Sequence, residues 1–131
     1  MEAHPQFKAW DKKEKLFKRV NSIRYITEYG KSTFIIEIQN RYCNEFVTAE
    51  RVDLVQFTGL QDKDGKDIYV GDILQFEGHK DASKKVVTLE YGMFCLGNDS
   101  LWHYVSKNAY VIIGNRFKNP ELLNTGENDE N

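Results

Sequence analysis

A dense block of turn-forming residues between two apolar runs constrains the fold of this chain most. Residues 57–74 carry three glycines, Gly59, Gly65 and Gly71, together with four aspartates. Glycine adopts backbone conformations with positive φ that other residues rarely adopt. We therefore predict that these three glycines lie in turns and that at least one of them has positive φ.

The rest of the chain consists of short runs rich in β-branched and aromatic residues, separated by glycine turns at a spacing of roughly 8–12 residues. This pattern is typical of an all-β sandwich or barrel, so we predict a mainly β protein. Residues 40–51 fit either one or two helical turns or an irregular loop, and Pro120 suits the first position of a short helical turn over 119–123. The predicted strands are residues 7–10, 22–27, 33–39, 52–58, 73–77, 84–91, 93–96, 101–105 and 109–113.

Charge is unevenly distributed along the 131 residues. Residues 1–31 hold eight Lys or Arg and four Asp or Glu, a net charge of +4, whereas residues 32–131 hold ten and sixteen, a net charge of −6. The basic segment is either a solvated face or a weak surface for anions. The overall charge of −2 and the pI near 5.9 do not favour tight, non-specific binding of nucleic acid.

The aspartates of the central block raise the question of a calcium site. If Asp62 is position 1 of an EF-hand loop, glycine falls at position 4 instead of 6, and position 12 is Ile73 instead of glutamate. We therefore predict no metal and expect the aspartates to accept backbone N–H groups in turns. The residues concerned are Asp62, Asp64, Asp67 and Asp72, with Lys63 and Lys66 among them.

No catalytic arrangement is evident in the sequence. His4, His79 and His103 are far apart, and none has a second histidine two or four residues away. Cys43 and Cys95 form no CxxC motif, so we expect two reduced thiols, with a single disulfide as the alternative. These observations predict a protein that is not an enzyme and has no cofactor and no small-molecule substrate.

Aromatic residues lie near basic residues in two places. Such residues stack on single-stranded nucleic acid or dock on a partner, although in a small β domain they more often fill the core. We expect residues 101–105 to form a strand, with Trp102 and Tyr104 on one face. The candidate contact surface consists of Trp10, Lys12, Lys13, Trp102, His103 and Tyr104.

The sequence gives no sign of a membrane protein. Residues 1–22 contain no apolar segment of the kind found in signal peptides, and no run of about 18 apolar residues occurs. We therefore expect a cytoplasmic location and no contact with a membrane.

Three motifs stand out along the chain: Phe7-Lys8-Ala9-Trp10-Asp11, the block from Gln56 to Ile73, and Ile113-Gly114-Asn115 followed by Asn119-Pro120-Glu121-Leu122-Leu123. These motifs, in this order, resemble the YopX family, small proteins encoded by temperate phages and prophages of Gram-positive bacteria. Arg116-Phe117 stands where the family often has a tyrosine, and residues 20–55 are not diagnostic.

The resemblance implies a fold but no chemistry, because the family has no established activity or catalytic residue. It implies a single domain over residues 1–123, with a β-rich segment at 5–51 packed against an SH3-like barrel at about 52–115, in a subdomain that extends to 123. Residues 124–131 have nothing to bury and are expected to be a disordered acidic tail. The motif residues expected to be structural are Gly59, Asp62, Gly65, Ile68, Tyr69, Gly71, Asp72 and Ile73.

Two classes of function remain open. The first is a phage or prophage accessory protein, a non-enzymatic module that binds a protein partner or another copy of itself, with nucleic acid ranked second as the ligand. The second is a small enzyme of unknown reaction. SH3-like barrels present sheet edges on which peptides and other chains dock, and this favours the binding module.

Overall fold

The computed structural model describes residues 7–79 and 81–123. These residues form eleven β-strands and two short helical segments, so the prediction of a mainly β protein is confirmed. The chain divides into two compact units, Met1–Gln56 and Phe57–Asn131. The domain boundaries proposed from the sequence stay predictions, and the expected tail at 124–131 lies outside the described residues.

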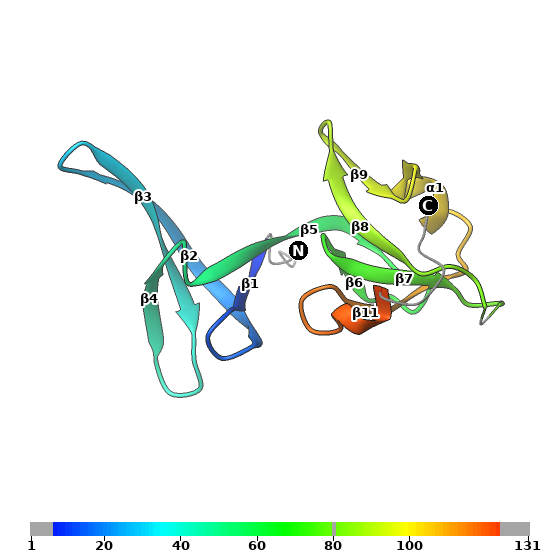
Figure 1. Ribbon diagram of the computed structural model, residues 1–131, viewed down its shortest axis with the longest axis horizontal. Helices are drawn as coiled ribbons and strands as arrows, with labels where there is room; N and C mark the ends of the chain where they lie inside the picture. Colours follow the sequence, from blue (N-terminus) through cyan, green and yellow to red (C-terminus); the bar gives the residue numbers. More distant parts are fainter. Residues whose placement is uncertain (1–6, 80, 124–131) are drawn as a thin grey trace. The chain divides into compact units, whose positions relative to one another are not determined.

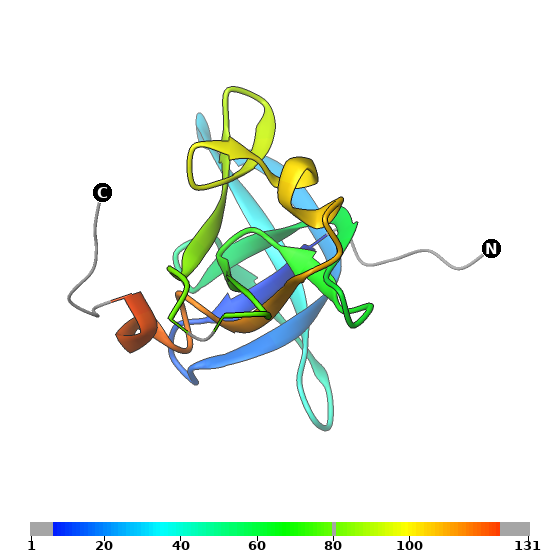
Figure 2. The same ribbon diagram turned by 90° about the vertical axis from the view of Figure 1, so that its right-hand side faces the viewer.

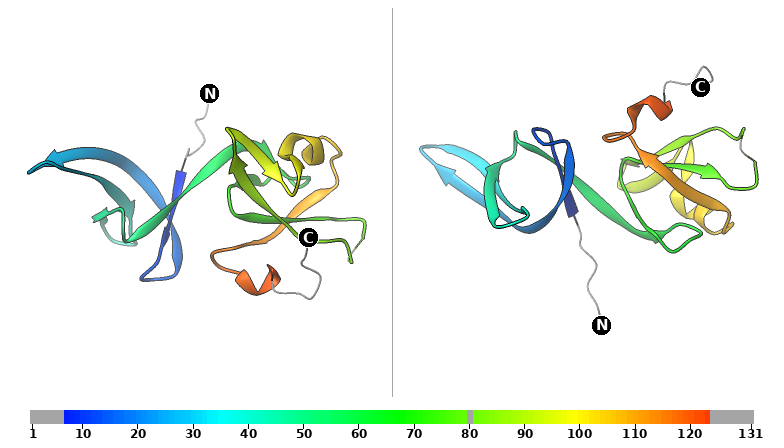
Figure 3. Two further views of the ribbon diagram at one scale, coloured as in Figure 1. Left: turned by 45° about the horizontal axis from the view of Figure 1, so that its top comes forward. Right: turned by 90° about the horizontal axis from the view of Figure 1, so that it is seen from below.

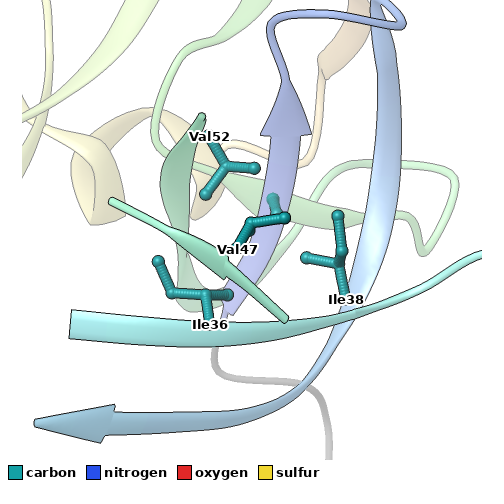
Figure 4. Packing of buried hydrophobic residues seen from close by; sticks show 5 residues of the cluster. Ile36, Ile38, Val47 and Val52 are labelled. Atoms are coloured by element: carbon teal, nitrogen blue, oxygen red, sulfur yellow. The ribbon is translucent and has the colours of Figure 1, made fainter. Parts of the chain in front are cut away.

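The first unit is an antiparallel sheet with the strand order β4-β3-β2-β1-β5 (Figure 1). Its core packs Ala9, Ile36, Ile38, Val47 and Val52, four of which Figure 4 labels. Ile36 and Ile38 lie two positions apart on β3 and therefore share one face of that strand. The strands are β1 (Phe7–Asp11), β2 (Leu16–Glu28), β3 (Lys31–Gln39), β4 (Asn44–Thr48) and the first part of β5 (Val52–Gln61).

A two-residue turn, Tyr29-Gly30, joins β2 to β3. Tyr29 and Gly30 both have positive φ, +53° and +75°, which is the geometry of the tight turns that match the twist of paired strands. The register pairs Tyr25 with Phe34 and Ile23 with Ile36. Between Val20 and Ser22 the register shifts by one residue, so Asn21 is a β-bulge.

Strand β4 corrects the expectation of helical turns or an irregular loop within residues 40–51. Phe46 and Val47 pair with Glu37 and Ile36 of β3. Val47 is buried in the core whereas Phe46 is exposed. The segment alternates between a buried and a solvated face only because β3 is beside it, and a five-residue run is too short to show this period reliably by itself.

The second unit contains a five-stranded antiparallel sheet with the order β10-β9-β8-β7-β11. The last part of β5 pairs with β6 (Asp67–Tyr69). The core consists of Ile68, Leu74, Val87, Leu96 and Leu101, all with 0% exposure. The remaining strands are β7 (Asp72–Phe76), β8 (Lys85–Glu90), β9 (Met93–Leu96), β10 (Asp99–Ser100) and β11 (Tyr110–Asn115).

The strands of the described residues do not close into a barrel. Strand β11 pairs with β7 through a strand ladder, but on its other side it receives only two links from the loop after β5. The Lys63 N–H donates to the Tyr110 carbonyl at 3.0 Å, and the Ile112 N–H donates to Asp62 Oδ2 at 3.0 Å. A carboxylate therefore stands where a closed barrel would have a continuous ladder.

Helix α1 (Leu101–Val105) corrects the prediction of a strand over the same residues (Figure 2). Ser100 caps the helix, since its side chain accepts a hydrogen bond from the His103 N–H at 3.2 Å. Leu101 is fully buried and Trp102 is 63% exposed. Alternating apolar residues suggested a strand, but the serine cap and one buried anchor determine the structure.

The short helical turn predicted for residues 119–123 is confirmed as a 3₁₀ helix, η1 (Pro120–Leu123), shown in orange-red in Figure 2. Pro120 takes its first position. No helix among residues 7–79 and 81–123 is long and apolar enough to cross a membrane.

Candidate interaction surface

The three glycines of the central motif all have positive φ, so the prediction that at least one does is confirmed. The values are +84° for Gly59, +84° for Gly65 and +97° for Gly71. Gly65 and Gly71 lie in turns as predicted, whereas Gly59 lies within strand β5, where the pairing with β6 is irregular, so the turn prediction is wrong for Gly59. Gly71 has a second constraint, because a Cβ atom there would lie 2.8 Å from Cε2 of Phe117. Its N–H also donates to the Val87 carbonyl at 2.8 Å. Gly71 is therefore required for both backbone conformation and close packing.

Asp62 connects the motif loop to strand β11. Its Oδ1 accepts the N–H groups of Asp64 at 2.8 Å and Lys66 at 2.9 Å, and its Oδ2 accepts that of Ile112 at 3.0 Å. The side chain is 8% exposed. The expectation that this aspartate accepts backbone N–H groups is thus confirmed, and both of its oxygens are engaged.

Asp72 has a similar task at the turn between β6 and β7. Its Oδ2 accepts the Tyr69 N–H at 2.8 Å inside the protein. Ile68 and Ile73, on either side, are fully buried, and Tyr69 contacts Phe57 with ring centroids 5.5 Å apart. The motif residues therefore build the turns and the core of the second unit.

The residue types that commonly bind metal ions do not cluster in the part of the chain that the structure describes. Among residues 7–79 and 81–123, no three His, Cys, Asp or Glu side chains are placed so that they could hold a metal ion. Cys43 is exposed and Cys95 is buried, and both are free thiols.

The predicted contact residues lie in two groups, one in each unit. Trp10 is only 6% exposed and contacts Phe17, so little of its ring is available to a partner. Lys12 pairs with Asp53 at 3.5 Å, and Lys13 is exposed.

In the second unit, Trp102 and His103 are exposed on α1, whereas Tyr104 is half-buried. The Tyr104 ring packs against Tyr110 with centroids 5.1 Å apart. Trp102 and His103 are therefore the members of this group that remain accessible.

A buried ion cluster in the first unit was not foreseen from the sequence. Asp11 is fully buried and accepts two hydrogen bonds from Arg51, at 2.8 Å each, and one from Lys18 Nζ at 2.8 Å. Lys18 also donates to Glu14 and to Asn40, and Arg51 donates to Glu45. The signal in the sequence is that Asp11 shares a strand face with Ala9, a core residue.

These contacts shift the pKa values of the cluster in opposite directions. The Arg51 guanidinium holds the pKa of Asp11 well below its usual range; burial opposes this shift, and Lys18 and the amides of Lys13 and Glu14 reinforce it. Burial lowers the pKa of Lys18, but its bonds to Asp11 and Glu14 outweigh burial and raise it overall. The cluster is therefore charged at neutral pH.

The candidate interaction surface is the free end of the β2–β3 ribbon, residues 22–34, which we call the arm. Strand β1 pairs with β2 only at Leu16–Arg19, and β4 pairs with β3 only from Ile35 onward. Within the first unit, the arm therefore extends past its neighbouring strands (Figures 1 and 3).

One face of the arm is apolar and exposed. Ile23 is 39%, Tyr25 62% and Phe34 45% exposed, and the rings of Tyr25 and Phe34 lie 5.1 Å apart. This face continues the one that carries buried Ile36, the cross-strand partner of Ile23. Alternation along the strand places Ile23 and Tyr25 on one face, but it does not show that the neighbouring strands end before they cover that face.

Two antiparallel sheet units, one with a protruding hairpin that exposes an apolar face, define the class of this protein: a small, mainly β protein. The model of the YopX protein family matches residues 6–124, and the chain belongs to that family. The resemblance inferred from its motifs is therefore confirmed.

Two solved structures are similar to this chain over most of its length. Protein EF1440 from Enterococcus faecalis is 28% identical with a TM-score of 0.64, over 93% of this chain and 99% of that one. Protein yopX from Bacillus subtilis is 17% identical with a TM-score of 0.54, over 89% and 96% of the two chains, and supports the fold alone. No curated protein matches the chain.

Proposed function

We propose that this protein is a non-enzymatic binding module that contacts a protein, either a different one or another copy of itself, through the arm. The observation that carries the proposal is the exposed apolar face of Ile23, Tyr25 and Phe34. Aromatic side chains are enriched at protein interfaces and depleted elsewhere on surfaces. Burying Tyr25 and Phe34 against a partner would remove a large apolar area from water.

A binding role is supported over catalysis by the way the buried carboxylates are used. Asp11 is held by Arg51 and Lys18, and Asp62 and Asp72 accept backbone N–H groups. A catalytic acid or base needs a carboxylate within reach of a substrate. These three instead stabilise strands and turns.

A protein partner is favoured over nucleic acid because the basic segment is partly used inside the first unit. Lys18 of this segment is buried and paired with Asp11 and Glu14. Arg51, outside the segment, is mostly buried and also paired with carboxylates. Lys12 is also paired, with Asp53. Neutralising a phosphate requires basic side chains that are free to meet it.

We further propose that the second unit is an open relative of SH3-like barrels, and that the protein is a phage or prophage accessory factor in the cytoplasm of a bacterial host. The five-stranded sheet and the Asp62 link to β11 support the first statement. The bacterial origin of the two similar structures supports a bacterial host.

The test is co-purification from the bacterial host with a tagged chain, an untagged copy being expressed alongside it. We expect a protein to co-elute with the natural chain and to be lost when Tyr25→Ser and Phe34→Ser are combined. Tyr91→Ser is the control, because Tyr91 is a fully exposed aromatic residue in the second unit. Circular dichroism establishes that all variants fold.

Two results would contradict the proposal. One is the same set of co-eluting proteins with the natural chain and with the arm variant. The other is co-elution of nucleic acid alone, which would place the alternative ligand first.

A further inference from the structure

We propose that the arm binds a second copy of this chain, through antiparallel pairing of the β2 strands about a two-fold axis at Ile26. This inference rests on the proposed function and identifies the partner of the same surface. It is carried by an open strand edge and by the placement of two charges along it.

The open edge is the side of β2 that faces away from β3. Strand β1 pairs with β2 only as far as Arg19, and no other strand of residues 7–79 and 81–123 pairs with this edge between Val20 and Glu28. An edge of nine residues exceeds the usual strand length of about 5–6 residues. The open edge of β3 in the arm is shorter, residues 31–34, so β2 is the better template.

The residues of this edge favour addition of a strand. Residues 20–28 contain no glycine or proline and include Val20, Ile23, Ile26 and Thr27, which are β-branched. Proteins usually protect a long edge with proline, several charges or a very short strand. Here the only charged residues of the segment are Arg24 and Glu28, and the bulge at Asn21 lies at one end.

Arg24 and Glu28 select the register of the pairing. Antiparallel pairing centred on Ile26 places residues whose numbers sum to 52 opposite one another, so Arg24 of each chain lies opposite Glu28 of the other. Opposite charges at directly paired positions stabilise a sheet, and like charges destabilise it. Within the described residues, neither Arg24 nor Glu28 takes part in an ion pair.

The same register also brings the apolar faces together. Tyr25 lies opposite Thr27 of the second copy, and Ile23 lies beside Tyr25 on the same face of β2. The uncharged faces of the two arms then form one continuous surface across four strands. The pairing thus extends a two-stranded ribbon, which is marginally stable alone, into a four-stranded sheet.

Competing arrangements lack these contacts. A parallel, in-register pairing places Arg24 against Arg24 and Glu28 against Glu28, which repels twice. The two-fold arrangement uses the β2 edge of each chain once, so association stops at the dimer. The charges therefore favour a closed dimer over a growing fibre.

The test measures the mass of the full chain in solution by light scattering over a range of concentrations. We expect the natural chain to be a dimer. Arg24→Glu or Glu28→Arg alone should weaken dimerisation about tenfold to hundredfold, because each variant creates two like-charge pairs. Combining the two substitutions restores opposite charges at both pairs and should restore the dimer.

The control is Lys107→Glu, which changes one exposed charge in the second unit and should leave the dimer intact. A natural chain that stays monomeric at every concentration overturns the inference, as does a dimer that both single variants leave unchanged or that the double variant fails to restore. If the chain is monomeric but the Tyr25 and Phe34 variant still loses a co-purifying protein, the proposed function stands and this inference fails.

Discussion

Asn115 and Asn119 bind each other's backbone at the end of strand β11. The Asn115 N–H donates to Asn119 Oδ1 at 3.2 Å, and the Asn119 N–H donates to the Asn115 carbonyl at 2.8 Å. Asn115 Oδ1 also accepts the N–H groups of Phe117 and Lys118. Gly114 lies against the same turn, where a Cβ atom would come 2.7 Å from Asn119 Oδ1. The closing motif of the sequence is therefore one interlocked turn.

Replacing Asn115 with alanine should lower the free energy of unfolding by about 1–2 kcal/mol, since two N–H groups lose the side chain that caps them. Urea denaturation followed by circular dichroism measures the change. Lys118→Ala is the matched control, because it retains the backbone N–H and removes only an exposed side chain. Equal stability of the two variants would contradict the capping role.

Gly71→Ala should destabilise the protein more than Gly65→Ala. Both substitutions force a side chain into positive φ, which costs about 1–3 kcal/mol. Only Gly71 also meets Phe117, whereas the space around Gly65 is open. The difference between the thermal unfolding midpoints of the two variants measures how much the steric clash with Phe117 destabilises Gly71→Ala. Equal midpoints would count against this contact.

Asp62→Ala should cost about 2–4 kcal/mol of stability, because three backbone N–H groups lose a charged acceptor. The loss should be accompanied by faster amide hydrogen exchange at Ile112, whose N–H binds Asp62 directly. Asp64→Ala is the control, since the side chain of Asp64 is exposed and only its N–H takes part in the turn. Unchanged exchange at Ile112 would show that the carboxylate does not hold β11.

Calcium and magnesium should not bind the motif loop with submillimolar affinity. Both oxygens of Asp62 already accept N–H groups, and a metal would have to displace them. Isothermal titration calorimetry of the full chain checks this directly. A saturable heat of binding that disappears in Asp62→Ala would mean that the loop rearranges around an ion.

Stability should fall as the pH is lowered through the acid range. The pKa of Asp11 is depressed in the folded protein, chiefly by Arg51, so the unfolded chain takes up its proton first. The stabilisation is complete above the unfolded pKa of about 3.9 and is lost progressively as the pH falls below it toward the folded value.

Unfolding free energies measured between pH 7 and pH 2 test this dependence. Arg51→Met should cost about 3–5 kcal/mol at pH 7, because it leaves a buried carboxylate short of its main partner. It should also flatten the decline at low pH. A steep decline that is the same in Arg51→Met and in the natural chain would assign the effect to other carboxylates.

Sequence reasoning located the turns better than the surfaces. The turns at Gly65 and Gly71, both with positive φ, follow from residue type, because glycine adopts positive φ at low cost. Gly59 also has positive φ, but it lies within strand β5 instead of the predicted turn. The strand at Asn44–Thr48 and the helix at Leu101–Val105 were missed, because each depends on a neighbour: β3 in the first case and the capping Ser100 in the second. Local pattern alone does not report such neighbours.

The candidate surface was harder to predict for a related reason. Trp10 and Tyr25 look alike in the sequence, each an aromatic residue in a short strand near basic residues. The structure buries Trp10 to 6% and leaves Tyr25 62% exposed. Their exposure differs because the neighbouring strands β2 and β5 extend past Trp10, whereas β1 and β4 end before they reach Tyr25. The ends of those strands are fixed only when the whole sheet has formed.

The bulge at Asn21 makes the faces of the arm depend on the length of the chain at this point, so an insertion or deletion there would change them more than a substitution would. Side chains alternate between the two faces of a strand, so removing Asn21 would move each later side chain of β2 to the opposite face. Arg24 and Ile26 would then occupy the side that Ile23 and Tyr25 now take, while the core below Val20 kept its packing. Among homologous chains, the number of residues between Val20 and Ser22 should therefore determine which face of the ribbon is apolar. Deletion of a single codon would then be enough to change the partner that a relative binds.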